Sequence, residues 1–305
     1  MKTPIGRIAL MLVGIVIVSL VITALCGVQT PTKKENTLQV VAASYPMYTA
    51  TLQVTRGSEG VTVHNLTKPT AGCLHDYQLS PAERLLLDEA DVVILSGAEP
   101  FMEPLYTELS AVLVNTTDPL FAGIEESYEE LHHDHAHTHM WLDPDAYETQ
   151  VEEIMKALCE ADAANAALYR QNAAAYIEQT QTAVAEFRQA VAALSVSKAL
   201  LFHESMAEIA EVAELDVLGL LPIGEDSGFS AAEVAAAAEA VRGQTVLFLY
   251  DEQYPQQMTQ LLSYASRGAA VSLCSAVKAV HGVDDADVWL WSMRENANRI
   301  KVAMK

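Results

Sequence analysis

The chain has 305 residues, 51% of them hydrophobic, which is enough apolar material for one large or two medium domains and excludes a disordered protein. Its 40 acidic residues outnumber its 18 basic ones and give a formal net charge of −22. This balance argues against nucleic acid or anionic lipid headgroups as partners of the folded part and weakly favours a cation as ligand.

The N-terminus has the pattern of an export signal. Residues 8–25 form an apolar run behind a short basic head, and Cys26 follows directly. We predict a signal peptide over residues 1–25 and a lipidated tether over residues 26–37, with extracytoplasmic attachment to the cell membrane through Cys26 alone. An uncleaved anchor helix is the alternative, because the apolar run is about long enough to span a bilayer.

From residue 38 onward, short apolar runs alternate with helical patterns. Repetition of strand followed by helix predicts a mainly parallel sheet. The helix between the second and third strands has Ser80 as N-cap, Pro81 at the first position and Glu83 to complete a capping box. His75 therefore lies in the loop just before a helix. The expected strands are 38–43, 61–66, 91–96 and 111–114.

A histidine-rich segment follows the first set of strands. We predict a mobile surface loop over residues 129–138, because this stretch is acid-flanked and too polar to bury a core. His139 differs from the loop histidines by position: it directly precedes "MWLDP", so its backbone belongs to the folded lobe. The loop histidines are His132, His133, His135 and His137.

Residues 144–194 contain almost nothing but helix formers, with Pro144 at the expected helix start. A stiff connector packed on both lobes is favoured over a coiled coil, because the apolar residues show no sustained heptads. We therefore predict an α/β fold in which an N-terminal lobe (residues 38–143) and a C-terminal lobe (residues 195–305) are joined by this connector. Each lobe is expected to hold a mainly parallel sheet flanked by helices, and the connector to include a long rigid linking helix.

The C-terminal lobe repeats the alternation of the N-terminal lobe. Ser230 with Glu233 predicts a second capping box. The expected strands are 199–202, 215–220, 245–249 and 270–273.

Three histidines are the candidate ligands of a divalent metal. His75, His139 and His203 are each expected at a strand end or helix entry, where open α/β sheets assemble ligand sites. Each one alone has a structural alternative as a hydrogen-bonded histidine of the core or a loop. Together they fit a metal held by neutral imidazoles, with Asp76, Asp143 and Glu204 available to orient the outer ring nitrogens.

The cysteines indicate no other metal site. Besides Cys26 the chain has Cys73, Cys159 and Cys274, an odd and widely spaced set that supports neither a disulfide framework nor a zinc finger.

Six segments carry a family resemblance when they are taken in chain order. They are "VVAASYPMY" at 40–48, "HDYQLSP" at 75–81, "ADVVILSGAEPFMEPL" at 90–105, "HMWLDP" at 139–144, "LFHES" at 201–205 and "ADVWLWSMRENANRIKVAM" at 286–304. With these segments the chain resembles the zinc- and manganese-binding solute-binding lipoproteins of bacterial ABC importers. The resemblance covers nearly the whole chain after the leader.

This resemblance implies one metal held between two lobes and delivered to a membrane permease that works with its ATPase. It also places His75, His139 and His203 on the family's ligand positions. Manganese-binding members are expected to carry a carboxylate where this chain has His203, so the resemblance favours zinc. Imidazole is also a better ligand for zinc than for manganese, which prefers oxygen donors.

The chain departs from the family pattern at two places. "AGCLHDY" replaces a more usual turn containing Pro and Glu before His75, and Cys274 lies in the loop where many relatives supply an aspartate. We expect water as the fourth zinc ligand, because three imidazoles with an open position bind zinc and leave it releasable. Cys274, Asp251 and Glu252 are the alternatives.

Other functions remain as competing hypotheses. They are a manganese-binding importer component, an adhesin-type lipoprotein and a zinc hydrolase that uses the exchangeable water. The sequence contains no HExxH motif or nucleophile elbow to support hydrolysis, and we predict a binding protein, not an enzyme.

Overall fold

The structure is a computed structural model that describes residues 37–67, 74, 77–97, 99–121, 139–221, 230–252 and 263–304. Residues 38–305 form one compact unit. The predicted signal peptide, Cys26, the histidine-rich loop, Cys73 and His75 with Asp76 lie outside the described residues. Within the described part of the chain, no helix is both long and apolar enough to cross a membrane.

The first sheet has four parallel strands in the order β2-β1-β3-β4. All four residues of β3 are buried, as expected for a central strand covered on both faces. The strands confirm the four predicted ones to within one or two residues at each end. They are β1 (Leu38–Ala42), β2 (Val61–Asn65), β3 (Val92–Leu95) and β4 (Val112–Asn115).

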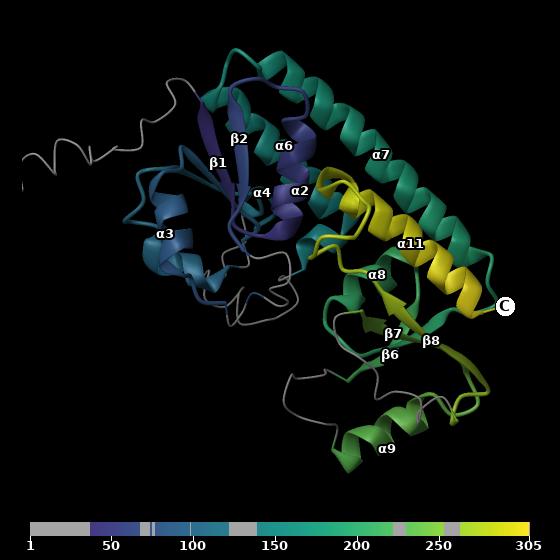
Figure 1. The fold of residues 1–305 in the computed structure, drawn as a ribbon. Coiled ribbons are helices and arrows are strands. Elements are labelled where there is room, and N and C mark those ends of the chain that lie inside the picture. The colour runs from purple at the N-terminus through teal and green to yellow at the C-terminus, as the bar shows by residue number, and fades with distance from the viewer. Residues whose placement is uncertain are drawn as a thin grey trace, which may run out of the picture. The chain divides into compact units, whose positions relative to one another are not determined.

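Helices connect these strands and cover the first sheet (Figure 1). They are α2 (Tyr45–Val54), α3 (Pro81–Asp88), the 3-10 helix η2 (Pro100–Leu105) and α4 (Asp118–Phe121). The predicted capping box is present at α3: the Ser80 hydroxyl accepts from the Glu83 amide, and the Glu83 carboxylate accepts from the Ser80 amide.

The second sheet repeats the pattern, with parallel strands in the order β6-β5-β7-β8. Two strands are longer than predicted. β7 continues past residue 249 to Asp251, and β8 begins at Arg267 instead of residue 270. The strands are β5 (Lys198–Leu201), β6 (Asp216–Leu220), β7 (Thr245–Asp251) and β8 (Arg267–Leu273). The associated helices are α8 (Met206–Val212) and α9 (Ala231–Ala240), and α9 carries the second predicted capping box.

The predicted helical connector is two helices, α6 (Pro144–Ala161) and α7 (Ala166–Ala192). The chain breaks at Asp162, whose carboxylate accepts from the Asn165 amide and side chain and from the Tyr169 hydroxyl. The long helix α7 links the two lobes, and it packs on α6 and on the C-terminal helix α11 (Val288–Ala303) (Figure 1).

The helices connect both sheets through a shared core. One cluster of buried side chains includes Val40 and Val92 of the first sheet and Leu201 and Leu247 of the second. Tyr176 of α7 and Trp289 of α11 belong to the same cluster. The fold is therefore α/β with two parallel four-stranded sheets, as predicted, and its lobes share buried surface.

The strand order locates the region where a ligand is expected. In the second sheet, the order reverses beside β5, so the connections leaving the carboxyl ends of β5 and β7 diverge. Open parallel sheets bind ligands outside such a switch point. His203 follows β5 by two residues and Asp251 ends β7.

Candidate functional site

His139 is held by packed structure. It is the N-cap of the 3-10 helix η4 (Met140–Leu142), its carbonyl accepts from the Leu142 amide at 2.8 Å, and the residue is only 8% exposed. Its ring contacts the Trp141 ring edge-on, with centroids 5.3 Å apart. The Trp141 indole donates to the Ser275 carbonyl at 2.9 Å, so His139 is supported from the C-terminal lobe.

His203 lies in the turn between β5 and α8. Its carbonyl accepts from the Met206 amide at 3.0 Å at the start of that helix. Its Nδ1 accepts from the Ser205 amide at 3.1 Å and lies 2.7 Å from the Ser205 hydroxyl. The turn therefore fixes the Nδ1 side of the ring.

The fold brings these two predicted ligands together. The ring centroids of His139 and His203 lie 5.4 Å apart at an interplanar angle of 75°. His75 lies outside the described residues, and the described residues contain no group of three or more His, Cys, Asp or Glu side chains arranged to hold a metal. His75 as third ligand thus stays a prediction.

Cys274 and Glu252 contact each other, and Glu252 also pairs with two basic residues. The Cys274 thiol donates to Glu252 at 3.4 Å, and burial, reinforced by the Glu252 charge, raises the pKa of this thiol well above its usual range. Burial alone would also raise the pKa of Glu252, but hydrogen bonds from Arg299 at 2.9 Å and Lys278 at 3.1 Å outweigh it and lower that pKa. The raised pKa keeps the Cys274 thiol protonated. The Glu252 carboxylate is anionic, but two basic residues already engage it, so neither group is a ready zinc ligand.

Asp251 has a different environment. It is 1% exposed, and its Oδ2 accepts from the Ser205 hydroxyl at 3.3 Å. Asp143, considered from the sequence as a partner for a histidine, instead caps α6 by accepting from the amides of Asp145 and Ala146. Sequence reasoning missed Ser205, whose only signal was a hydroxyl two residues after His203.

One carboxylate of α8 is perturbed near the site. Burial first, and then the charges of Asp143 and Glu211, raise the pKa of Glu208 from 4.5 to about 7. Helix α8, which carries Glu208, packs against η4.

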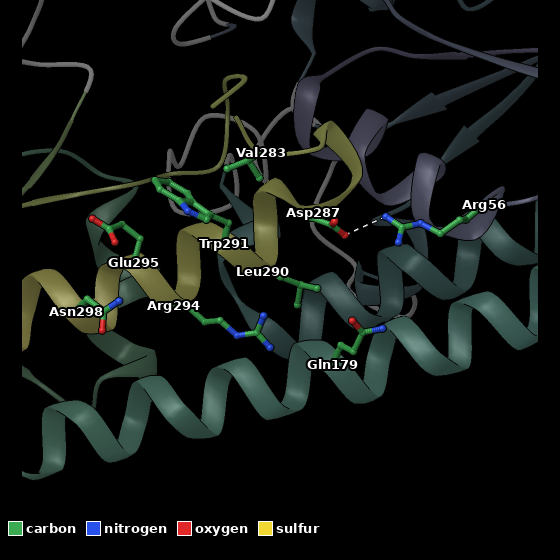
Figure 2. Close-up of a pocket in the computed structure, with 9 residues that line it drawn as sticks. All are labelled: Arg56, Gln179, Val283, Asp287, Leu290, Trp291, Arg294, Glu295 and Asn298. Carbon is green, nitrogen blue, oxygen red and sulfur yellow. Dashed lines mark hydrogen bonds and ion pairs between the residues drawn. The ribbon is translucent and has the colours of Figure 1, made fainter. Parts of the chain in front are cut away.

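A separate cavity of about 440 Å³ lies between α7 and α11 (Figure 2). Its two arginines are paired: Arg56 with Asp287 at 3.0 Å and Arg294 with Glu186 at 3.3 Å. The described residues that line it include no histidine or cysteine, so it lacks the nitrogen and sulfur donors that zinc prefers.

Comparison with known proteins finds relatives that are named as metal-binding or metal-uptake proteins. The family described as zinc-uptake complex component A, periplasmic, matches residues 40–303. The chain is 28% identical over 201 residues to an iron-binding protein, YfeA, of Yersinia pestis, covering 62% of this chain and 60% of that protein. It is 25% identical over 231 residues to the high-affinity zinc uptake system protein ZnuA of Bacillus subtilis, covering 70% of this chain and 72% of that protein.

The fold has a close structural match as well. A crystal structure of ZnuA superimposes with a TM-score of 0.65 at 22% sequence identity, covering 88% of this chain and 100% of that one. The family match spans both sheets and the linking helix, and it confirms the resemblance inferred from the sequence segments and the prediction of a non-enzymatic protein. The chain belongs to the family of periplasmic zinc-uptake complex components, which are metal-binding solute-binding proteins of ABC uptake systems.

Proposed function

We propose that this protein captures a zinc ion between its two lobes outside the cytoplasm and delivers it to a membrane permease that works with its ATPase. The observation that carries the proposal is the pair of imidazoles, His139 and His203. Their ring centroids lie 5.4 Å apart, although His139 comes from the predicted N-terminal lobe and His203 from the C-terminal lobe. Neutral imidazole is a common zinc ligand in proteins, and two rings at this separation can share one ion.

His75 is the proposed third ligand. The support comes from its place in "HDYQLSP", just before the capped helix α3, and from the family to which the chain belongs. Water is the proposed fourth ligand. The contacts of Cys274 and Glu252 with each other, with Arg299 and with Lys278 support water over these two side chains.

Zinc is proposed over iron and manganese because of the donors. The relative from Yersinia pestis is named as an iron-binding protein, so the family match alone leaves the metal open. Manganese and ferrous iron bind nitrogen ligands more weakly than zinc does, and manganese favours carboxylate oxygens. A site with imidazole at position 203 therefore favours zinc.

Three further features complete the proposal. We propose that the predicted loop binds additional zinc weakly, because closing on a metal would cost it conformational entropy. Its histidines are His132, His133, His135 and His137. Cys26 is proposed to carry a lipid that holds the protein at the membrane, and the lobe boundaries at residues 143 and 195 are proposed as the limits of the linking segment.

The test is a metal-binding measurement on protein stripped of metal. We expect one zinc bound tightly after dialysis, with manganese and ferrous iron bound more weakly in competition titrations. The substitution His203→Ala should abolish tight binding, because it removes an imidazole from one lobe. Full affinity in that variant would place the site elsewhere, and a preference for iron would correct the metal.

A further inference from the structure

We propose that Trp141 is a positioning residue that sets the distance between the imidazoles of His139 and His203. Its indole N–H ties the 3-10 helix η4, which begins directly after His139, to the segment that follows β8. This inference rests on the proposed function, because it treats both histidines as metal ligands. It assigns Trp141 no contact with the metal itself.

The carboxyl edge of the second sheet is the frame to which His203 belongs. His203 follows β5 by two residues, and Ser275 follows β8 by two residues. Strand β7 lies between them and pairs with both β5 and β8. The pairing of β7 with β8 continues past β7, because the Glu252 amide donates to the Leu273 carbonyl at 2.9 Å. This ladder of hydrogen bonds fixes where Ser275 lies relative to His203.

Helix α11 also holds the segment that follows β8. The Asn296 side chain accepts from the Cys274 amide at 2.7 Å and donates to the Cys274 carbonyl at 2.9 Å. Asn296 is buried, so bulk water does not compete for these two bonds. They fix the backbone of Cys274, and the Ser275 carbonyl, one residue further along, is therefore a stationary acceptor.

Trp141 connects His139 to this frame. The Trp141 indole donates to the Ser275 carbonyl at 2.9 Å in a buried contact between residues 134 positions apart. Trp141 lies two residues after His139, and one short turn joins them, closed by the Leu142 amide donating to the His139 carbonyl. The two rings also contact each other edge-on. A shift of the indole therefore moves His139 through the backbone and through the ring contact.

The hydrogen bond contributes something that the burial of Trp141 does not. Apolar burial is non-directional, so it would allow the indole to slide while remaining covered. A hydrogen bond weakens steeply away from its preferred geometry, and it therefore fixes the position of the ring. Because a metal ligand must be held within about 0.5 Å of its productive geometry, a small shift of His139 relative to His203 is enough to weaken metal binding.

The experiment compares Trp141→Phe with the wild type. Phenylalanine keeps an aromatic ring beside His139 but has no N–H group to donate to Ser275. We expect zinc affinity to fall about tenfold or more, as metal sites commonly respond when a supporting partner of a ligand is lost. Competition titrations with a zinc chelator would measure the change.

Tyr169→Phe is the matched control. It also removes one hydrogen-bond donor from a buried aromatic side chain, because the Tyr169 hydroxyl donates to Asp162 at 2.8 Å. This bond lies at the opposite end of α6 from η4, about 27 Å along a helix of 18 residues. Zinc affinity should therefore stay unchanged in this variant.

A second readout reports the spacing of the two imidazoles without metal. In the zinc-free wild type, NMR should show a nuclear Overhauser effect between ring protons of His139 and His203, because the ring centroids lie 5.4 Å apart. This signal should weaken in Trp141→Phe and persist in Tyr169→Phe. A loss of global stability alone would not change it in the folded molecules.

The wild type alone tests the hydrogen bond if Trp141→Phe does not fold. The indole N–H of Trp141 should exchange with deuterium more slowly than that of Trp291, which is half-buried and lines the cavity between α7 and α11 (Figure 2). Exchange of the two indoles at the same rate would overturn the positioning role.

The remaining outcomes separate this inference from the proposed function. If the wild type binds zinc, but Trp141→Phe keeps full affinity or keeps the full signal between the two rings, the positioning role is overturned and metal capture stands. If the wild type binds no zinc, the proposed function fails, while a ring-to-ring signal that weakens in Trp141→Phe and not in Tyr169→Phe still supports the positioning role.

Discussion

At the scale of single residues, His139 is held by its neighbours, and it is the first residue described after the histidine-rich segment. A ligand must be held close to its productive geometry by its neighbours. His139 has such neighbours: its ring packs on Trp141, and the Trp141 carbonyl accepts from the indole of Trp289 at 2.7 Å. Trp289 in turn stacks on Tyr147 with ring centroids 4.6 Å apart. These aromatic contacts connect His139 to α6 and α11.

The first prediction compares two histidines of the same segment. His139→Ala should weaken zinc binding at the tight site at least tenfold, or about 1.4 kcal/mol, because it removes a preorganised ligand. His137→Ala should change that affinity little, because residue 137 belongs to the predicted loop. Competition titrations with a zinc chelator would measure both variants side by side. Equal affinities would show that His139 is not the structural ligand among these histidines.

At the scale of elements, two helices begin where local capping contacts favour a helix start. Ser80 and Ser230 each form a reciprocal capping box with a glutamate three residues later. These contacts lie within one turn, so the sequence specifies them without help from the rest of the fold. The break between α6 and α7 is also local, because Asp162 satisfies amides of the following turn, but no Gly or Pro marked it.

The second prediction concerns α8 and its contact with η4. Glu208 has its pKa raised from 4.5 to about 7 by burial and by the charges of Asp143 and Glu211. The folded state therefore holds this proton more tightly than the unfolded chain does. Ionisation destabilises the fold, and the loss grows as pH rises from about 4.5 to about 7.

Glu208→Gln should therefore stabilise the protein at pH 8, on the order of 1 to 3 kcal/mol, and have little effect at pH 4. Urea unfolding at the two pH values would measure the difference. Glu211→Gln is the control on the same helix: Glu211 is exposed, so neutralising it should give a smaller gain. A gain of the same size at both pH values would contradict the assigned cause.

At the scale of the whole molecule, the two lobes are joined by more than the linking helix. The turn at the 3-10 helix η5 (Asp285–Asp287) contacts α2 of the other lobe. Gln53 donates to the Ala286 carbonyl and to Asp287, each at 2.8 Å, and the Tyr45 hydroxyl donates to Asp285 at 2.8 Å. Together with the shared core, these bonds oppose a wide separation of the lobes around the histidines.

The last prediction concerns attachment of the protein to the membrane. Cys26→Ser should prevent lipid modification, so that the protein is released or its processing stalls, because Cys26 is the only cysteine directly behind the apolar run. Membrane fractionation with mass spectrometry of the N-terminus would show the result. Unchanged membrane retention at unchanged mass would instead favour an uncleaved anchor helix formed by residues 8–25.

The sequence by itself determined the elements of this protein and the class of its fold. All eight strands, both capping boxes and the helical connector were predictable, because hydrophobic periodicity and capping act over a few residues. His139 and His203 could be chosen as candidates because they follow or precede such elements.

Only the tertiary structure decided which side chains meet. The contact of Ser205 with Asp251 joins residues 46 positions apart, and it depends on the pairing of β5 with β7 and on the extension of β7 to Asp251. The engagement of Cys274 and Glu252 with Arg299 likewise requires α11 to pack beside β8. Such contacts follow from the register of strands and the packing of helices, which no local pattern specifies.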